Sequence, residues 1–233
     1  MYPYGMFYDS SYVLILIGMG LVMLAQWKVK STFAKYSELN SLKQIRGYEA
    51  AEIILKANQI NDVRVEKVAG QLTDHYSPQE KVLRLSEATY DQTSVAALAV
   101  AAHECGHAVQ DATGYPLLRL RSALVPVTQF GSMIGMPLIL IGFVMQLMGL
   151  VTLGIIAFSA ALVFQIVTLP VEFDASRRAL ATLESAGVFS TEEVPAARKV
   201  LRAAAFTYIA ATLSTALQVL RLVLLANRSR RND

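Results

Sequence analysis

The residues best suited to chemistry in this chain of 233 residues are two histidines separated by three positions, His103 and His107. They lie in a stretch from Ser94 to Asp111 that is rich in alanine, contains no proline and is followed by Gly114. These features predict a helix of about four to five turns that starts behind a capping serine. Because positions i and i+4 share one face of a helix, both imidazoles can bind a single metal ion.

Glu104 follows the first histidine and completes the pattern HExxH. Its carboxylate lies next to the metal-binding face without joining the two imidazoles as a ligand. That placement suits a base that takes a proton from a water activated by the metal. HExxH is typical of zinc metallopeptidases. The spacing therefore predicts one Zn²⁺ ion bound by His103 and His107, with Glu104 as the general base.

Long apolar stretches predict an integral membrane protein. The residues from 122 to 171 form a run of fifty without Asp, Glu, Lys or Arg, whereas one bilayer crossing takes about 20 residues. The run divides near Gly149 into two helices, 124–147 and 150–169, which predicts a transmembrane hairpin with a very short turn. Residues 12–27 are also uncharged. A cleaved signal peptide would have basic residues before such a segment, and none precede residues 12–27. We interpret them as a retained anchor.

A fourth stretch leaves two alternatives. Residues 203–220 carry no charge but contain several hydroxyl side chains, and Arg221 separates them from the apolar residues 222–226. The segment is either a fourth span, packed through its small and hydroxyl side chains, or a helix lying along the membrane surface. We favour the span.

Basic residues follow the first predicted span and flank the hairpin on one side of the membrane. They are Lys28, Lys30, Lys35, Arg119, Arg121, Arg177 and Arg178. The positive-inside rule therefore places the N-terminus outside and the segments 28–123 and 170–202 in the cytoplasm. These membrane flanks also account for the net charge of +3 without a nucleic-acid partner.

The cytoplasmic segments predict a small α+β lobe. Residues 32–58 are expected to be helical, and 63–68, 72–76 and 81–86 are expected to be extended. This order matches a zincin lobe, in which a sheet lies over the helix that carries the histidines. A peptide substrate could add to residues 81–86 as to an edge strand. The expected fold class is a mainly α membrane protein, with transmembrane helices plus a zincin-like lobe whose short strand meander lies over the HExxH helix.

The hairpin indicates where a third ligand would come from. A helical hairpin returns the chain to the side that it left, and the first acidic residue there is Glu172. Since a catalytic zinc usually has three protein ligands, Glu172 is the predicted third one. Asp174 is its competitor. The residue that does not bind would orient a ligand from the second shell or pair with Arg177 or Arg178.

Two other residues with reactive side chains receive structural interpretations. His75 precedes a Ser77-Pro78 turn, and we interpret it as a hydrogen-bonded turn histidine rather than a ligand. Cys105 lies about 200° around the helix from His103, so we expect a packed thiol. As the single cysteine it can form no disulfide within the chain, which is compatible with a reducing cytoplasm.

Four segments carry a resemblance that extends over nearly the whole chain. They are LTDHY (72–76), KVLRLS (81–86), AHECGHA (102–108) and LPVEFDASRR (169–178). Taken together, they resemble the YugP-type bacterial membrane zinc metallopeptidases. The layout is also similar to the heat-shock protease HtpX and the CAAX prenyl proteases, in which HExxH is followed by membrane helices and then by a glutamate ligand. The resemblance implies a gluzincin endopeptidase. In those relatives an aspartate follows the ligand glutamate by four residues, whereas Ser176 holds that position here.

The predicted function is that of an integral-membrane zinc endopeptidase. It would act near the cytoplasmic membrane face on peptides or proteins, membrane proteins among them. One alternative is a zinc-binding pseudoenzyme or assembly factor. The other is a transporter, but the hairpin contains no charged residue of the kind that a transport path needs. The predicted organisation is an anchor (1–27), a zincin-like lobe (28–123), the hairpin (124–169), a third-ligand helix with a cytoplasmic segment (170–202), and a fourth span with a basic tail (203–233).

Overall fold

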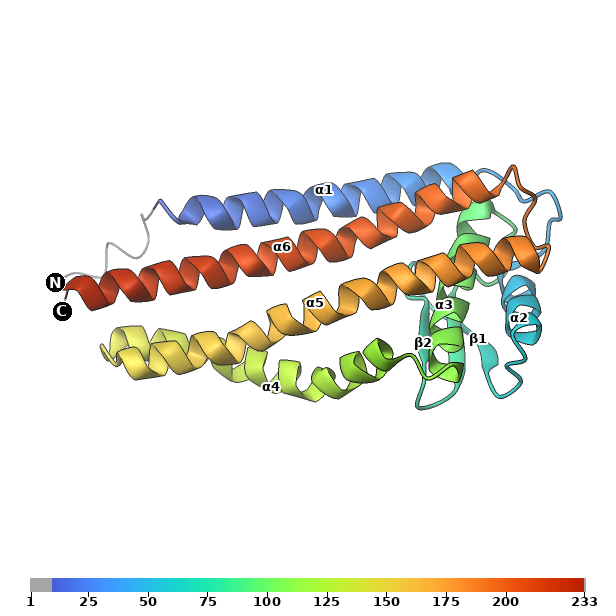
Figure 1. Cartoon of the computed structure of the whole chain (residues 1–233). Coiled ribbons are helices and arrows are strands. Elements are labelled where there is room, and N and C mark those ends of the chain that lie inside the picture. Colours follow the sequence, from blue (N-terminus) through green and yellow to red (C-terminus); the bar gives the residue numbers. More distant parts are fainter. Residues whose placement is uncertain (1–9, 233) are drawn as a thin grey trace. The chain divides into compact units, whose positions relative to one another are not determined.

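The computed structural model describes residues 10–232 and is mainly helical (Figure 1). Residues 1–9 of the predicted anchor lie outside the described part. The elements in chain order are α1 (Tyr12–Ser37), α2 (Gly47–Ala57), β1 (Arg64–Val68), β2 (His75–Ser77), β3 (Val82–Ser86), α3 (Val95–Ala112), α4 (Pro116–Val144), α5 (Met148–Ser185) and α6 (Val194–Asn232).

The chain divides into two compact units, and the long helices contribute to both. The first unit comprises residues 1–25, 120–169 and 207–233. The second unit comprises residues 26–119 and 170–206. It therefore contains α2, α3, the three strands and the part of α5 that follows Leu169.

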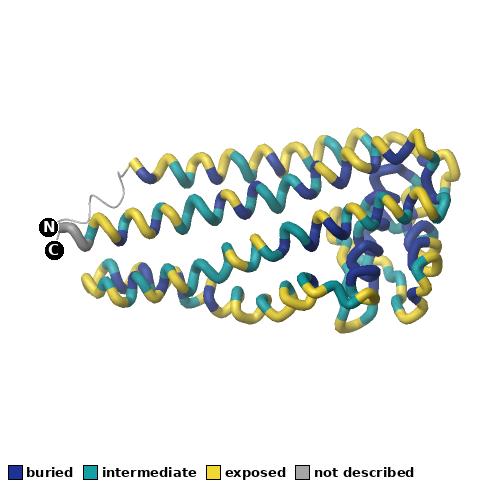
Figure 2. Tube along the Cα trace, viewed as in Figure 1, coloured by how far each residue is buried: buried dark blue, intermediate teal, exposed yellow. Residues whose placement is uncertain are grey.

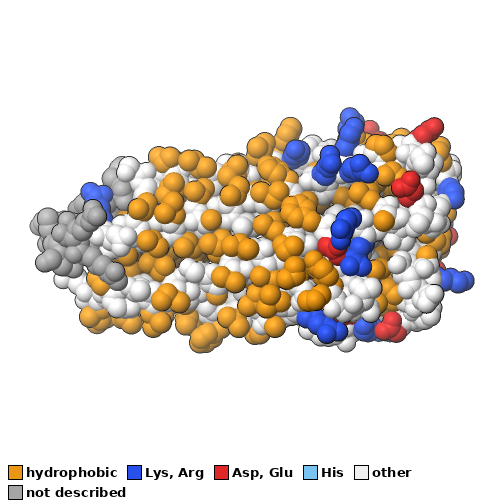
Figure 3. All heavy atoms as spheres, viewed as in Figure 1, with side chains coloured by type: hydrophobic (Ala, Val, Ile, Leu, Met, Phe, Trp, Pro, Cys, Tyr) orange, Lys and Arg blue, Asp and Glu red, His pale blue; other side chains and the backbone are white. Residues whose placement is uncertain are grey.

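Four of the described helices are long and apolar enough to cross a membrane: α1, α4, α5 and α6, the last over Val194–Ser229. Many large apolar residues of these helices are exposed in the first unit. Figure 2 marks exposed residues along the chain, and Figure 3 shows hydrophobic side chains on the surface. Met23 is 68% exposed and Ile156 is 65% exposed. Such apolar surface is what the hydrocarbon of a bilayer would cover. The residues of the fourth stretch continue through α6 as one uninterrupted helix.

The predicted hairpin is formed by α4 and α5, which are joined by residues 145–147. The turn comes slightly earlier than expected because Gln146 adopts the left-handed conformation (φ 57°). Glycines let the two helices pack closely. A Cβ on Gly131 would lie 2.5 Å from the carbonyl oxygen of Ala157, and one on Gly135 would lie 2.9 Å from the amide nitrogen of Phe158. The GxxxG pattern at 131–135 therefore serves the packing of the hairpin itself.

In the second unit, α3 forms the centre of the core. Its N-cap is Ser94, whose hydroxyl accepts a hydrogen bond from the amide of Ala97 at 3.2 Å. Leu98 of α3, Ile54 of α2 and Leu83 of β3 are almost completely buried and belong to one hydrophobic cluster. The predicted helix at 94–111 is confirmed, and α3 is buried along most of its length (Figure 2). A helix packed in this way can hold side chains at defined positions.

The expectation of one helical segment at 32–58 was wrong. The helix α1 ends at Ser37, and residues 38–46 are irregular before α2 begins at Gly47. The amide of Ser41 donates to the carbonyl of Thr93 at 2.9 Å. A Cβ on Gly47 would lie only 2.2 Å from the carbonyl oxygen of Thr89. These contacts with the segment that leads into α3 override the local preference for helix.

The expected strand meander was wrong in its order. The sheet has the order β1-β3-β2, with β1 parallel and β2 antiparallel to β3. Leu83 and Leu85 make β3 the most apolar strand, and both are fully buried, so β3 takes the central place. The chain leaves β1 through Gly70 (φ +105°) and Leu72 (φ 56°) and pairs on the far side of β3. The residues 81–86 therefore do not form an edge strand, and the edges are β1 and β2.

Candidate metal centre

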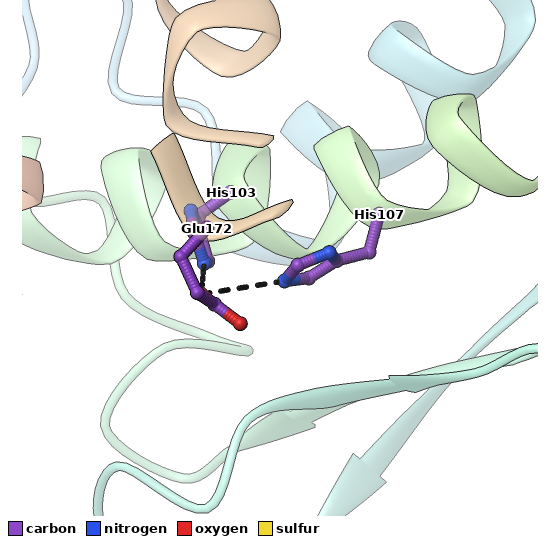
Figure 4. Close-up of side chains that lie close together, drawn as sticks. All are labelled: His103, His107 and Glu172. Atoms are coloured by element: carbon purple, nitrogen blue, oxygen red, sulfur yellow. Dashed lines mark hydrogen bonds and ion pairs between the residues drawn. The ribbon is translucent and has the colours of Figure 1, made fainter. Parts of the chain in front are cut away.

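Three side chains of the second unit converge on one point (Figure 4). His103 and His107 lie one turn apart on α3, and Glu172 lies on α5. The Oε2 atom of Glu172 is 3.1 Å from Nε2 of His103 and 3.6 Å from Nε2 of His107. One possible ligand atom from each residue lies within 4.8 Å of the others.

The spacing of these atoms fits a zinc ion. With zinc bonds of about 2.0–2.1 Å and tetrahedral angles, ligand atoms lie about 3.3 Å apart. The observed separations of 3.1 and 3.6 Å bracket that value. Two imidazoles and one carboxylate also form a donor set that catalytic zinc sites use, with the fourth position left open. Glu172 is almost completely buried, so solvent does little to stabilise its charge.

Gly106, inside the HExxH motif, allows α5 to approach α3 at the site. A Cβ at this position would lie 2.4 Å from the carbonyl oxygen of Ala175 and 3.0 Å from its carbonyl carbon. Both neighbouring atoms belong to a helix backbone, which cannot move aside easily. The absence of a side chain at Gly106 therefore lets Glu172 reach the two histidines.

Glu104 lies beside the three converging side chains and is buried. Burial raises the pKa of its carboxyl group to about 7, and the negative charge of Glu172 acts in the same direction. The imidazoles of His103 and His75 oppose this rise. A carboxyl group with such a pKa can both accept and release a proton at neutral pH.

Asp174 does not join the cluster. Its Oδ2 accepts hydrogen bonds from Nε of Arg178 at 2.6 Å and from Nε2 of Gln110 at 3.0 Å. Its Oδ1 accepts from Nη2 of Arg177. Of the two carboxylates that follow the hairpin, Glu172 lies with the histidines and Asp174 lies with two cations and an amide.

Each imidazole has a partner at its other ring nitrogen. Nδ1 of His103 lies 3.2 Å from the hydroxyl of Ser176, and Nδ1 of His107 lies 3.0 Å from Oε1 of Gln110. Sequence reasoning noted Ser176 only as a departure from its relatives and missed Gln110. A polar residue three positions after His107, on a helix that is otherwise rich in alanine, was the available clue.

His75 and Cys105, for which we expected structural roles, do not belong to the cluster. Nδ1 of exposed His75 lies 2.9 Å from the carbonyl oxygen of Thr73. Cys105 is buried, and its thiol donates to the carbonyl of Ala51 at 3.7 Å. The prediction of a packed thiol is confirmed, and burial raises the pKa of the Cys105 thiol well above its usual range.

A polar contact attaches the edge strand β2 to the end of α3. The hydroxyl of Tyr76 donates to Oδ2 of Asp111 at 2.8 Å, and Nζ of Lys81 donates to the same oxygen at 2.7 Å. Tyr76 belongs to β2, and Lys81 belongs to the turn between β2 and β3. The hairpin of β2 and β3 is therefore fixed beside the helix that carries the histidines.

Comparisons with known proteins agree with this chemistry. Residues 11–227 match the family described as "Putative neutral zinc metallopeptidase". The chain is 45% identical over 212 residues to the "Putative membrane protease YugP" of Bacillus subtilis (strain 168), a match that covers 91% of this chain and 94% of the relative. No solved structure gives a significant match. Together with the four apolar helices, the relative indicates a multi-pass membrane protein.

Proposed function

The chain belongs to the neutral zinc metallopeptidase family, and on that premise we propose that it is an integral-membrane, zinc-dependent endopeptidase. His103, His107 and Glu172 would hold the ion. The observation that carries the proposal is the convergence of both Nε2 atoms on Oε2 of Glu172. A site that were only structural would be expected to have four protein ligands.

When bound, zinc would polarise a peptide carbonyl and would lower the pKa of the attacking water towards about 7. Glu104 acts as the general base that takes the proton of the attacking water. It then passes this proton to the nitrogen of the leaving amine. The buried position that raises the pKa of Glu104 to about 7 supports both steps.

The open edge of β2 is the proposed place for the substrate backbone. The strand β3 is paired on both sides, so it cannot accept a further strand. Along β2 the described backbone hydrogen bonds are those to β3, and Tyr76 holds the strand beside α3. A peptide that adds to β2 would bind through its main chain and so with little demand on sequence.

We propose that the site faces the cytoplasm and that substrates are peptides or proteins, including membrane proteins. The orientation follows from the basic residues that flank the predicted spans, such as Lys28, Arg119 and Arg177. The four apolar helices would hold the chain in the bilayer, where it would meet membrane proteins without a diffusion step through the solvent.

The test is purification of the full chain in detergent, metal analysis, and digestion of an unfolded membrane protein with and without a chelator. We expect about one zinc per chain, cleavage that the chelator stops, and recovery of cleavage when zinc is added back. Zinc-loaded protein that cleaves nothing under any condition would instead favour a pseudoenzyme or an assembly factor.

A further inference from the structure

We propose that Gln110 is a positioning residue that holds the His107 imidazole with Nε2 directed at the metal and connects this imidazole to α5. The inference rests on the proposed zinc site. It assigns a role to a residue outside the HExxH motif, and it concerns how the two helices that supply ligands are kept in register.

The hydrogen bonds of Gln110 determine which way its amide points. Nε2 of Gln110 donates to the carbonyl oxygen of Val171 at 2.8 Å and to Oδ2 of Asp174 at 3.0 Å. A backbone carbonyl accepts hydrogen bonds and donates none, so the contact with Val171 by itself sets the direction. The NH₂ group must therefore face α5, and the amide oxygen must face His107.

This orientation also determines the tautomer of His107. Oε1 of Gln110 lies 3.0 Å from Nδ1 of His107, and an amide oxygen can only accept. Nδ1 must then carry the hydrogen, which leaves the lone pair of the neutral imidazole on Nε2. That atom is the one that lies 3.6 Å from Oε2 of Glu172. Gln110 thus presents the nitrogen that a metal needs.

The same amide fixes the backbone of the third ligand. Val171, whose carbonyl accepts from Gln110, immediately precedes Glu172. One side chain therefore touches the His107 ring and the peptide group beside Glu172, although these two residues come from different helices. Gln110 is fully buried, so water does not compete for its hydrogen bonds.

Asp174 is held as an acceptor for Gln110 by cations. Arg177 and Arg178 both donate to its carboxylate. These bonds orient the carboxylate, so that its Oδ2 faces the amide of Gln110. The chain of contacts therefore runs from two arginines through Asp174 and Gln110 to His107.

The experiment compares zinc affinity, measured by competition with a chromogenic chelator, across variants of the full chain in detergent. Gln110→Met has a similar length but removes all three hydrogen bonds. Cys105→Ala is the matched control, since it alters a buried side chain of α3 that contacts Ala51 rather than the site.

We expect Gln110→Met to bind zinc about 10- to 100-fold more weakly and Cys105→Ala to bind as the unaltered chain does. The visible spectrum of the Co²⁺-substituted protein should change in Gln110→Met alone, because it reports the geometry of the ligands. Circular dichroism melting will separate these effects from a loss of folding.

Native zinc affinity in Gln110→Met would overturn the inference. An unchanged Co²⁺ spectrum in this variant would also overturn it, because the amide would then serve helix packing alone. The outcome is separable from that of the proposed function. A chain that binds zinc with this pattern but cleaves nothing would keep the positioning role and reject the peptidase. A chain that binds no zinc would reject both.

Discussion

At the scale of single residues, Glu104 and Glu172 show how the surroundings of a carboxylate decide what it can do. Both are buried, but only Glu172 has an oxygen within 3.6 Å of both imidazoles. For Glu104, burial is the main cause of the raised pKa. A carboxylate that contacts the ligand nitrogens can coordinate a metal. One that lies beside them can move a proton.

The substitution Glu104→Gln should therefore lower the rate of peptide cleavage by roughly 10²- to 10⁴-fold and leave zinc bound. The amide keeps the shape of the side chain but cannot accept the proton. Zinc content by mass spectrometry and digestion of an unfolded membrane protein check both parts. As a contrast, His103→Ala and His107→Ala should each lower the metal content. Retained turnover in Glu104→Gln would show that Glu104 is not the general base.

The two carboxylates of α5 should respond differently to substitution. Glu172→Ala should lose both metal and activity, because two protein ligands rarely hold zinc tightly. Asp174→Asn should keep most of the zinc and lose activity by about 10- to 100-fold, since its partners are Gln110 and two arginines. Paired zinc and activity measurements on both variants make the comparison. The opposite pattern would assign the ligand to Asp174.

At the scale of the elements, the site depends on the contact between α3 and the part of α5 that follows Leu169. Gly106 and Ala175 meet backbone to backbone, and Gln110 bridges to Val171 further along. The proposed ligands thus come from two helices, and the position of Glu172 relative to the histidines is determined by how closely these helices approach.

Gly106→Ala should weaken zinc binding and lower the thermal stability, because the new methyl group would lie 2.4 Å from the carbonyl oxygen of Ala175. An intrinsic gain in helix propensity of up to about 1 kcal/mol would not offset a clash with backbone. Melting temperature and chelator competition are the measurements. Gly149→Ala is the control, because a Cβ there meets nothing within 4 Å. Unchanged zinc affinity in Gly106→Ala would show that the contact is looser than the structure indicates.

At the scale of the whole molecule, the positions of the described acidic residues distinguish the two units. Large apolar side chains are exposed on the helices of the first unit, and the described acidic residues lie in the second (Figure 3). Arg119, Arg177 and Arg178 lie in the second unit, next in sequence to the predicted hairpin. This arrangement is the basis for the proposed cytoplasmic site.

Cysteine labelling in intact cells tests that orientation. In a Cys105→Ser background, cysteines introduced at Leu42 and Ser185 should be protected from a membrane-impermeant thiol reagent, whereas one at Gly149 in the hairpin should react. All three positions are exposed, so burial does not explain protection. Permeabilised cells should label at all three positions. Labelling of the first two in intact cells would place the site outside the cytoplasm.

The local features of this protein could be predicted from its sequence. The helix of His103 and His107 follows from composition, a capping serine and a spacing of four, and the membrane helices follow from the length of the uncharged stretches. These properties depend on neighbouring residues and on transfer to hydrocarbon, both of which can be read along the chain. The return of the hairpin also limited the third ligand to Glu172 or Asp174.

Only the tertiary structure decided how distant segments meet. It brought Glu172 rather than Asp174 to the imidazoles, placed Ser176 and Gln110 at the Nδ1 atoms, and put β3 in the centre of the sheet. It also ended α1 at Ser37 where local preference favoured continued helix. Such choices depend on the rotation of one helix against another and on which strand is best buried, and neither has a counterpart in the spacing of residues along the chain.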